Sequence, residues 1–206
     1  MISKAENQPV LPKLNMTAKG RLTPAMHALN QWAAIDSGDK VLDMACGSGM
    51  LLKLINQRVD ANLCGIASTV EQSRAVRAML PESDILFAQP EDIPWRESSF
   101  DVVLCGLPFY AMEDPGKALK EALRVLKPGG QFLLATTWYP VPLRQLINCF
   151  SGLWEDAQPP VFYGKHEMLA ALEAVGFQKV TWRAADMRVG VTIGWKKPAW
   201  QEMLEA

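Results

Sequence analysis

The sequence predicts a three-layer α/β domain in which a mostly parallel sheet is covered by helices on both faces. Short apolar stretches alternate with amphipathic ones through most of the 206 residues, as strands and helices do in such a sheet. The first five apolar stretches are continuous, which is typical of strands buried on both faces. The last two predicted strands are too close together for a parallel crossover, so one of them should run antiparallel.

Start signals for helices can be read directly from the sequence. Thr23-Pro24 and Asp114-Pro115 each place an N-cap residue before a proline in the first turn. Thr69 to Gln72 has the pattern of a capping box. The predicted helices are 24–35, 50–59, 70–80, 115–126 and 165–175. Pro81 and Lys127-Pro-Gly-Gly130 end the third and the fourth of them.

The predicted strands are apolar segments bounded by turn residues. They are 41–44, 63–66, 85–88, 100–105, 131–137, 177–185 and 189–196. We expect a single domain over residues 1–206, with an irregular N-terminal arm over 1–22. The segment 138–164 is rich in proline and aromatic residues, and we interpret it as a lid or substrate-binding insertion.

The composition argues against several classes of protein. A formal net charge of −1 without a dense Lys/Arg segment disfavours a nucleic-acid or anionic-lipid surface. The four cysteines form no Cys-x-x-Cys pair, so no metal site is predicted and a reducing cytoplasm suits the chain. The polar N-terminal segment lacks the apolar core of a signal peptide, and no segment approaches the ~20 apolar residues of a membrane span. We therefore expect a cytoplasmic protein that does not cross a membrane.

The most informative stretch is Val41-Leu-Asp-Met-Ala-Cys-Gly-Ser-Gly-Met50. It places a carboxylate, Asp43, in an apolar strand, where it is unfavourable without a partner. Gly47 and Gly49 let the backbone approach a ligand, and ligands bind beyond the carboxyl ends of parallel strands. The stretch is not a dinucleotide fingerprint, because Leu52 replaces the third glycine and the acid precedes the glycines.

Together with other segments, this stretch resembles the class I S-adenosylmethionine (SAM) methyltransferases, closest to the small-molecule branch of ubiquinone and menaquinone biosynthesis. The resemblance covers roughly residues 30–140, and its segments are Val41–Gly49, Glu91-Asp-Ile-Pro-Trp95, Ser99-Phe-Asp-Val-Val103, 114–126 and Leu126-Lys-Pro-Gly-Gly130. It implies a Rossmann-like fold of seven strands with the last antiparallel. It also implies methyl transfer from SAM to a small-molecule acceptor.

The resemblance assigns a cofactor site residue by residue. It implies that Asp43 holds the amino-acid end of SAM, since a carboxylate suits a cationic methionine group. The other positions that it places at the cofactor are Ala45, Cys46, Gly47, Gly49, Ala67, Ser68, Gln89, Glu91, Asp92, Gly106 and Leu107. The alternative for Asp43 is a structural role in which it only caps amides of the turn.

Two positions depart from the family's pattern. Ala67 stands where the family has an acid that binds both ribose hydroxyls, and Pro90 replaces a residue whose N–H reaches the adenine. A hydrogen bond to a charged group contributes about 1.5–3 kcal/mol, so losing two would weaken binding by a factor of roughly 100 or more. Ser68 is a candidate substitute at the ribose, and Gln89 can still accept from the adenine amino group.

Three side chains are candidates for catalysis. Histidine is the usual base when an acceptor must lose a proton, and the chain has only His27, in the first helix, and His166, at the start of the last helix. Tyr110 follows the fourth strand and would lie near the methyl group. Each of the three also has a plain reading as a surface or packing residue.

Aromatic side chains gather in the segment interpreted as a lid. They are Trp138, Tyr139, Phe150, Trp154, Phe162 and Tyr163. They indicate either a pocket for an apolar or aromatic acceptor or an ordinary satellite core. Trp195 and Trp200 are candidates for the contact of a homodimer.

The sequence leaves four functions to compare. The first is methyl transfer to a small molecule, and the second is a degenerate protein that binds SAM, S-adenosylhomocysteine (SAH) or another ligand without methyl transfer. Leu52 and the missing acid after the second strand disfavour a nicotinamide oxidoreductase. The near-neutral charge disfavours a nucleic-acid methyltransferase, as does Gly106-Leu-Pro-Phe109, which lacks the Asn/Asp-Pro-Pro-Tyr/Phe signature.

Overall fold

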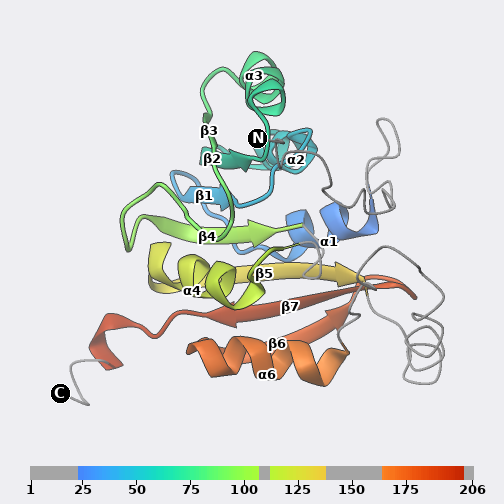
Figure 1. Cartoon of the computed structure of the whole chain (residues 1–206), viewed down its shortest axis with the longest axis vertical. Helices are drawn as coiled ribbons and strands as arrows, with labels where there is room; N and C mark the ends of the chain where they lie inside the picture. Colours follow the sequence, from blue (N-terminus) through green and yellow to red (C-terminus); the bar gives the residue numbers. More distant parts are fainter. Residues whose placement is uncertain (1–22, 107–111, 138–163, 202–206) are drawn as a thin grey trace, which may run out of the picture.

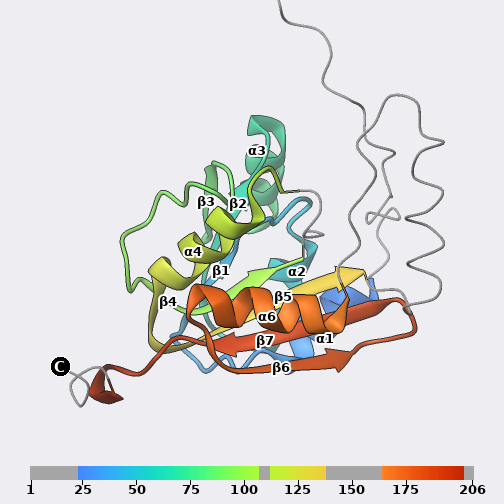
Figure 2. The same cartoon turned by 60° about the horizontal axis from the view of Figure 1, so that its bottom comes forward.

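The computed structural model describes residues 23–106, 112–137 and 164–201. These residues form one seven-stranded sheet in the order β3-β2-β1-β4-β5-β7-β6, with helices on both faces (Figures 1 and 2). The strands are β1 Lys40–Asp43, β2 Asn62–Ala67, β3 Asp84–Phe87, β4 Phe100–Cys105, β5 Leu126–Thr137, β6 Gln178–Ala184 and β7 Val189–Trp195. Strand β7 is antiparallel to both neighbours, and the other pairs are parallel. The predicted three-layer fold with an antiparallel last strand is confirmed.

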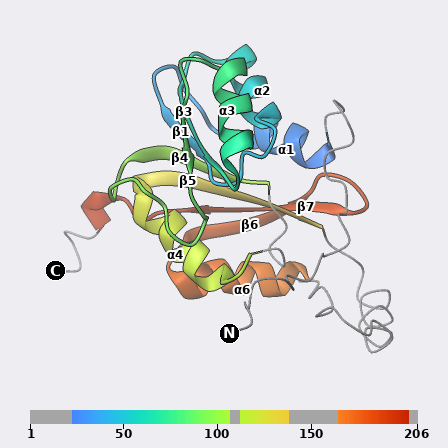
Figure 3. The same cartoon turned by 45° about the horizontal axis from the view of Figure 1, so that its top comes forward.

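The helices divide between the two faces of the sheet, as Figure 3 shows. Helices α1 Pro24–Trp32, α2 Met50–Arg58 and α3 Val70–Met79 cover one face, and α4 Pro115–Val125 and α6 Lys165–Val175 cover the other. The predicted N-caps are present, since the side chains of Thr23, Thr69 and Asp114 accept from backbone N–H groups at 2.9–3.2 Å. Helix α1 ends before the predicted Ile35, because the N–H of Ala34 is donated to the Gln131 side chain of β5 at 2.9 Å.

Strand β5 corrects the sequence prediction at its start. It begins at Leu126, whereas the Lys-Pro-Gly-Gly segment was expected to separate helix from strand. Phe100 pairs with Leu126 and Val102 pairs with Gln131, so residues 127–130 form a bulge opposite Asp101 of β4. Gly129 supplies the left-handed backbone conformation that this bulge uses, with φ of +80°.

A carboxylate fastens this bulge to the rest of the sheet. Both oxygens of Asp101 accept from the Lys127 ammonium, at 2.9 and 2.7 Å, and Oδ2 also accepts from the backbone N–H of Lys40 at 2.9 Å. Burial of Asp101 works against ionisation, but these hydrogen bonds and the Lys127 charge outweigh it and lower the pKa of the carboxyl. The contact joins the first residues of β1, β4 and β5 at the amino edge of the sheet.

A second ionic contact holds the segment 91–95 against α4. Glu121 accepts from the backbone N–H of Ile93 at 2.9 Å and from the Arg124 guanidinium at 2.7 Å. Arg124 in turn donates to the backbone carbonyls of Ile93 and Trp95, each at 2.9 Å. The Glu-Asp-Ile-Pro-Trp segment is therefore held in position by α4.

Among the described helices, none is long and apolar enough to cross a membrane.

Candidate functional site

Strand β1 ends on a buried carboxylate, directly before the turn. Asp43 is 2% exposed, and its Oδ1 accepts from the backbone N–H of Ala45 at 3.1 Å. Burial raises the pKa of this carboxyl from 3.8 to about 7, and the Ala45 hydrogen bond offsets only part of that rise. Within the described residues no Lys or Arg forms an ion pair with Asp43. A bound cation would therefore favour the ionised carboxylate.

The two glycines of this turn have different tasks. Gly49 has φ of +74°, and a Cβ there would lie 2.8 Å from Val76 Cγ1 and 2.8 Å from Met79 Cε of α3. Gly47 has φ of +49°, but a Cβ there would meet nothing closer than 4.0 Å. Gly49 is thus required where the turn packs against α3, whereas Gly47 leaves open space beside the turn.

That open space is a cavity of about 200 Å³ beyond the carboxyl ends of β1, β2 and β3. It lies on the β1 side of the point where strand order reverses, between β1 and β4, which is where open α/β sheets bind ligands. Its lining residues are Met44, Ala45, Gly47, Ile66, Ser68, Gln72, Ala88, Gln89 and Pro90. Four predicted cofactor residues come together here: Ala45, Gly47, Ser68 and Gln89. None of the lining side chains is ionisable.

Other predicted cofactor residues are buried beside the cavity. Cys46 is 4% exposed, and its backbone N–H donates to Ile66 at 2.9 Å, which ties the turn to β2. Burial raises the pKa of the Cys46 thiol to about 12, and the nearby Asp43 charge adds to the rise. Ala67 is 0% exposed. Neither of these two residues is among those that line the cavity.

The acidic pair after β3 has structural contacts. Glu91 Oε1 accepts from the backbone N–H groups of Glu113 and Asp114, at 2.9 and 3.3 Å, so it holds the start of α4. Asp92 is exposed, and its N–H donates to the carbonyl of Gln89 at 3.1 Å, which closes the turn there. Their predicted roles at the cofactor are not needed to explain either position.

Gly106, at the end of β4, borders α1. A Cβ built on Gly106 would lie 3.7 Å from Leu29 Cδ1, and Figure 1 shows α1 beside this end of β4. Leu107 and Tyr110 lie outside the described residues, as do residues 138–163 with their six aromatic side chains.

The two histidines lie on opposite faces of the sheet. His27 is exposed on α1, and His166 is exposed in the first turn of α6. Helix α6 leads into β6, which is parallel to β1–β5, so its first turn lies near the carboxyl edge of the sheet. The histidines are separate candidates for a base and do not form a pair.

Sequence reasoning missed Gln72 as a site residue. Its position in a capping-box pattern pointed to a role at the helix end, yet its side chain lines the cavity and accepts from the Ser68 hydroxyl at 3.0 Å. Nothing in the local pattern distinguishes the two orientations, because the rotamer of the side chain decides between them.

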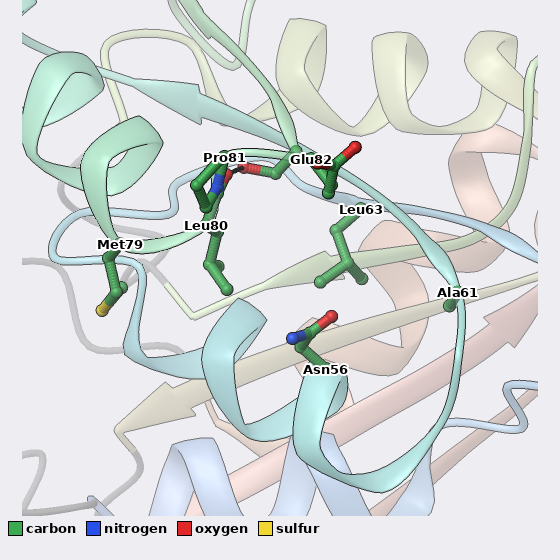
Figure 4. Close-up of a pocket in the computed structure, with 8 residues that line it drawn as sticks. Asn56, Ala61, Leu63, Met79, Leu80, Pro81 and Glu82 are labelled. Carbon is green, nitrogen blue, oxygen red and sulfur yellow. Dashed lines mark hydrogen bonds between the residues drawn. The ribbon is translucent and has the colours of Figure 1, made fainter.

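A second, smaller cavity of about 130 Å³ lies near the amino ends of β2 and β3, away from the β1 turn. Figure 4 shows Leu63, Leu80 and Asn56 pointing toward one another inside it. Its other lining residues are Ala61, Met79, Pro81, Glu82 and Ser83. Its polar side chains are Asn56, Glu82 and Ser83, and none of the residues predicted for the cofactor lines it. The described part of the chain also contains no group of three or more His, Cys, Asp or Glu residues suited to a metal ion.

Comparison with known proteins identifies the core of the chain. Residues 42–134 match the family model described as a methyltransferase domain. This part of the chain, slightly under half of it, therefore resembles a methyltransferase domain. The chain is also 28% identical over 197 residues to the 2-methyl-6-phytyl-1,4-hydroquinone methyltransferase of Synechocystis sp., in an alignment that covers 87% of this chain. That alignment spans 60% of the Synechocystis protein, so the chain corresponds to only part of it.

Solved structures share the fold at low sequence identity. The YcgJ protein of Bacillus subtilis superposes with a TM-score of 0.68 at 17% identity, covering 85% of this chain and 99% of that one. The [4+2]-cyclase SpnF superposes with a TM-score of 0.68 at 16% identity, covering 84% of this chain and 80% of that one. Proteins of this architecture therefore include one named for a different reaction, and function has to be argued from the site.

Proposed function

We propose that this domain binds SAM in the cavity beyond β1, β2 and β3 and transfers its methyl group to a small-molecule acceptor. The observation that carries the proposal is Asp43, a buried carboxylate without an ion-pair partner among the described residues, which ends β1 directly before the turn that lines the cavity. The α-amino group of SAM is a cation of the kind that would stabilise this charge.

The lining of the cavity also suits the nucleoside part of SAM. Met44, Ile66, Ala88 and Pro90 give it apolar walls, which fit the faces of an adenine ring. Gln89 is the polar side chain on the β3 side and could accept from the adenine amino group. Pro90 cannot donate to the ring, so the base is held through fewer polar contacts than the family pattern implies.

SAM, when bound, supplies an electrophilic methyl group, so the protein needs chiefly to orient donor and acceptor and to keep water out. We place the acceptor toward Gly106 and α1. His27, His166 and Tyr110 remain our candidates for taking a proton from it. Both histidines are exposed, and neither lines the cavity. Replacing the histidine that serves as the base should therefore lower kcat and leave SAM affinity unchanged.

For the acceptor we propose an apolar aromatic molecule of the hydroquinone type. The support is the name of the Synechocystis relative and the aromatic composition of residues 138–163. A cytoplasmic location and a homodimer formed through Trp195 and Trp200 complete the proposal. The cysteine pattern supports the location, and the 64% exposure of Trp200 supports the contact.

The competing proposal is a protein that binds SAM or SAH without methyl transfer. Ala67 and Pro90 favour it, because both remove polar contacts to the nucleoside. The two proposals share the cavity and differ only in turnover.

Calorimetric titration with SAM and SAH tests both. The protein is first denatured in a control sample and checked for carried-over ligand by mass spectrometry. Micromolar binding, followed by SAH release with a hydroquinone acceptor, is the expected result. Binding without turnover across an acceptor panel would favour the competing proposal. No binding and no carried-over ligand would refute both.

A further inference from the structure

We infer that Gln72, oriented by Ser68, binds the ribose hydroxyls of the ligand in place of the missing carboxylate. This inference rests on the proposed function and assigns two residues of the same site. It starts from a capping box that is only half formed. Thr69 accepts from the backbone N–H of Gln72 at 3.1 Å, but the Gln72 side chain does not return to the Thr69 N–H. Its Oε1 instead accepts from the Ser68 hydroxyl at 3.0 Å.

The orientation of Gln72 turns a helix-capping residue toward the cavity. Ser68 and Gln72 both line it, next to the end of β2. Ala67, the residue at the expected ribose position, is 0% exposed and has no side chain beyond its Cβ. The polar side chains that line this side of the cavity are therefore those of Ser68 and Gln72.

The pair has the hydrogen-bonding capacity that a ribose diol needs. With Oε1 occupied by Ser68, the Gln72 amide still has two N–H groups to donate, and the Ser68 oxygen still has lone pairs to accept. Each ribose hydroxyl can donate and accept, so a diol can accept from Gln72 and donate to Ser68. A carboxylate offers acceptors only. At this site one ribose hydroxyl would instead accept a hydrogen bond from Gln72, which a carboxylate could not donate.

The strength of such a contact can be estimated. A hydrogen bond between neutral groups contributes less than one to a carboxylate, so each bond is worth about a 5- to 10-fold change in affinity. We therefore expect weaker ribose binding than a carboxylate would give, but a clear preference for a ligand with a free diol.

The test compares adenosine with 2′,3′-dideoxyadenosine, and measures SAH affinity in parallel. Wild-type protein should bind adenosine at least about 25-fold more tightly than the dideoxy compound, since two bonds of this strength are lost. In Gln72→Ala this ratio and the SAH affinity should each fall about 5- to 10-fold. Binding of the dideoxy compound should be unchanged, which also shows that the cavity has kept its shape.

Two further variants complete the design. Ser68→Ala should also lower the ratio, and in the double variant the ratio should fall close to one, because Ser68 and Gln72 are the polar side chains that line the cavity next to the end of β2. Glu71→Ala is the matched control, since Glu71 is exposed on the same turn of α3 and does not line the cavity. It should leave both affinities unchanged.

The outcomes separate this inference from the proposed function. If wild-type protein binds SAH but Gln72→Ala keeps the adenosine preference, the ribose assignment is wrong and the proposed function stands. An equal loss in Glu71→Ala would also overturn the assignment, because the effect would then belong to the helix as a whole. If wild-type protein binds neither SAH nor adenosine, both fail together.

Discussion

Replacing Asp43 with asparagine should stabilise the ligand-free protein at neutral and alkaline pH while weakening its binding of SAH. Asparagine has the shape of the aspartate and keeps an oxygen that can accept from Ala45. What it loses is the ability to ionise in a position that is 2% exposed. The substitution therefore isolates the effect of one buried charge.

The magnitude follows from the pKa of the carboxyl. Burial raises this pKa from 3.8 to about 7. At 1.36 kcal/mol per pH unit, the ionised carboxylate lowers the free energy of unfolding by about 4 kcal/mol at most. Between these two pKa values the folded protein holds a proton that the unfolded chain has released, so stability falls as pH rises through this window. Asparagine does not titrate. The difference in free energy of unfolding between the variant and the wild type should therefore increase by about 1–3 kcal/mol as pH rises from 5 to 8.

Urea denaturation of both ligand-free proteins at several pH values between 5 and 8 measures this gain. Asp101→Asn is the control. The pKa of Asp101 is lowered, so this carboxylate is ionised in both folded and unfolded protein over that range. Its loss of stability should be the same at each pH. A difference between Asp43→Asn and the wild type that stays constant, or that shrinks as pH rises, would show that Asp43 does not carry a buried titrating charge.

Two further substitutions test contacts of the fold. Gly49→Ala should lower the free energy of unfolding by about 2–5 kcal/mol, because it adds a clash with α3 to the cost of a left-handed backbone. Gly38→Ala is the control, since Gly38 has φ of +87° but no atom lies within 4 Å of the new Cβ. It should lower the free energy of unfolding by only about 1–2 kcal/mol. Equal losses for the two variants in urea denaturation would contradict the close approach of Gly49 to α3. Glu121→Gln should lower the free energy of unfolding by about 1–2 kcal/mol, because its contacts with Arg124 and the Ile93 N–H weaken. The exposed Glu173→Gln should have no effect in the same assay, and a similar loss in both would refute the role of the contact.

Local signals account for what the sequence predicted well. The range predicted for the last helix, 165–175, is that of α6, because the glycine that follows and the apolar spacing are both properties of the segment itself. The predicted start of β5 was wrong because it depends on a contact that is distant in sequence. Proline and two glycines usually end regular structure, and it is Asp101, far away in the chain, that holds residues 127–130 within the strand pairing.

The candidate site shows the same division. Asp43 and Gly47 could be placed at the carboxyl edge of the sheet because the end of a buried strand and its turn are adjacent in sequence. The contacts of Glu91 with the start of α4 depend on packing between distant segments, and no local pattern reveals them. Gln72 was missed because two orientations of one side chain are both compatible with the sequence around it.

The ionic contact of Asp101 lies at the edge of the sheet opposite the cavity, and this separation bears on how such a protein can change over evolutionary time. Ala67 and Pro90 lie at the carboxyl edge of the sheet, beside the cavity, and neither takes part in the contacts of Asp101 or Glu121 that tie the elements together. Substitutions such as these at the carboxyl edge consequently leave the ionic contact at the amino edge intact. A lineage can pass through weakly binding or inactive intermediates without losing the protein, and departures from the family pattern can accumulate in this way.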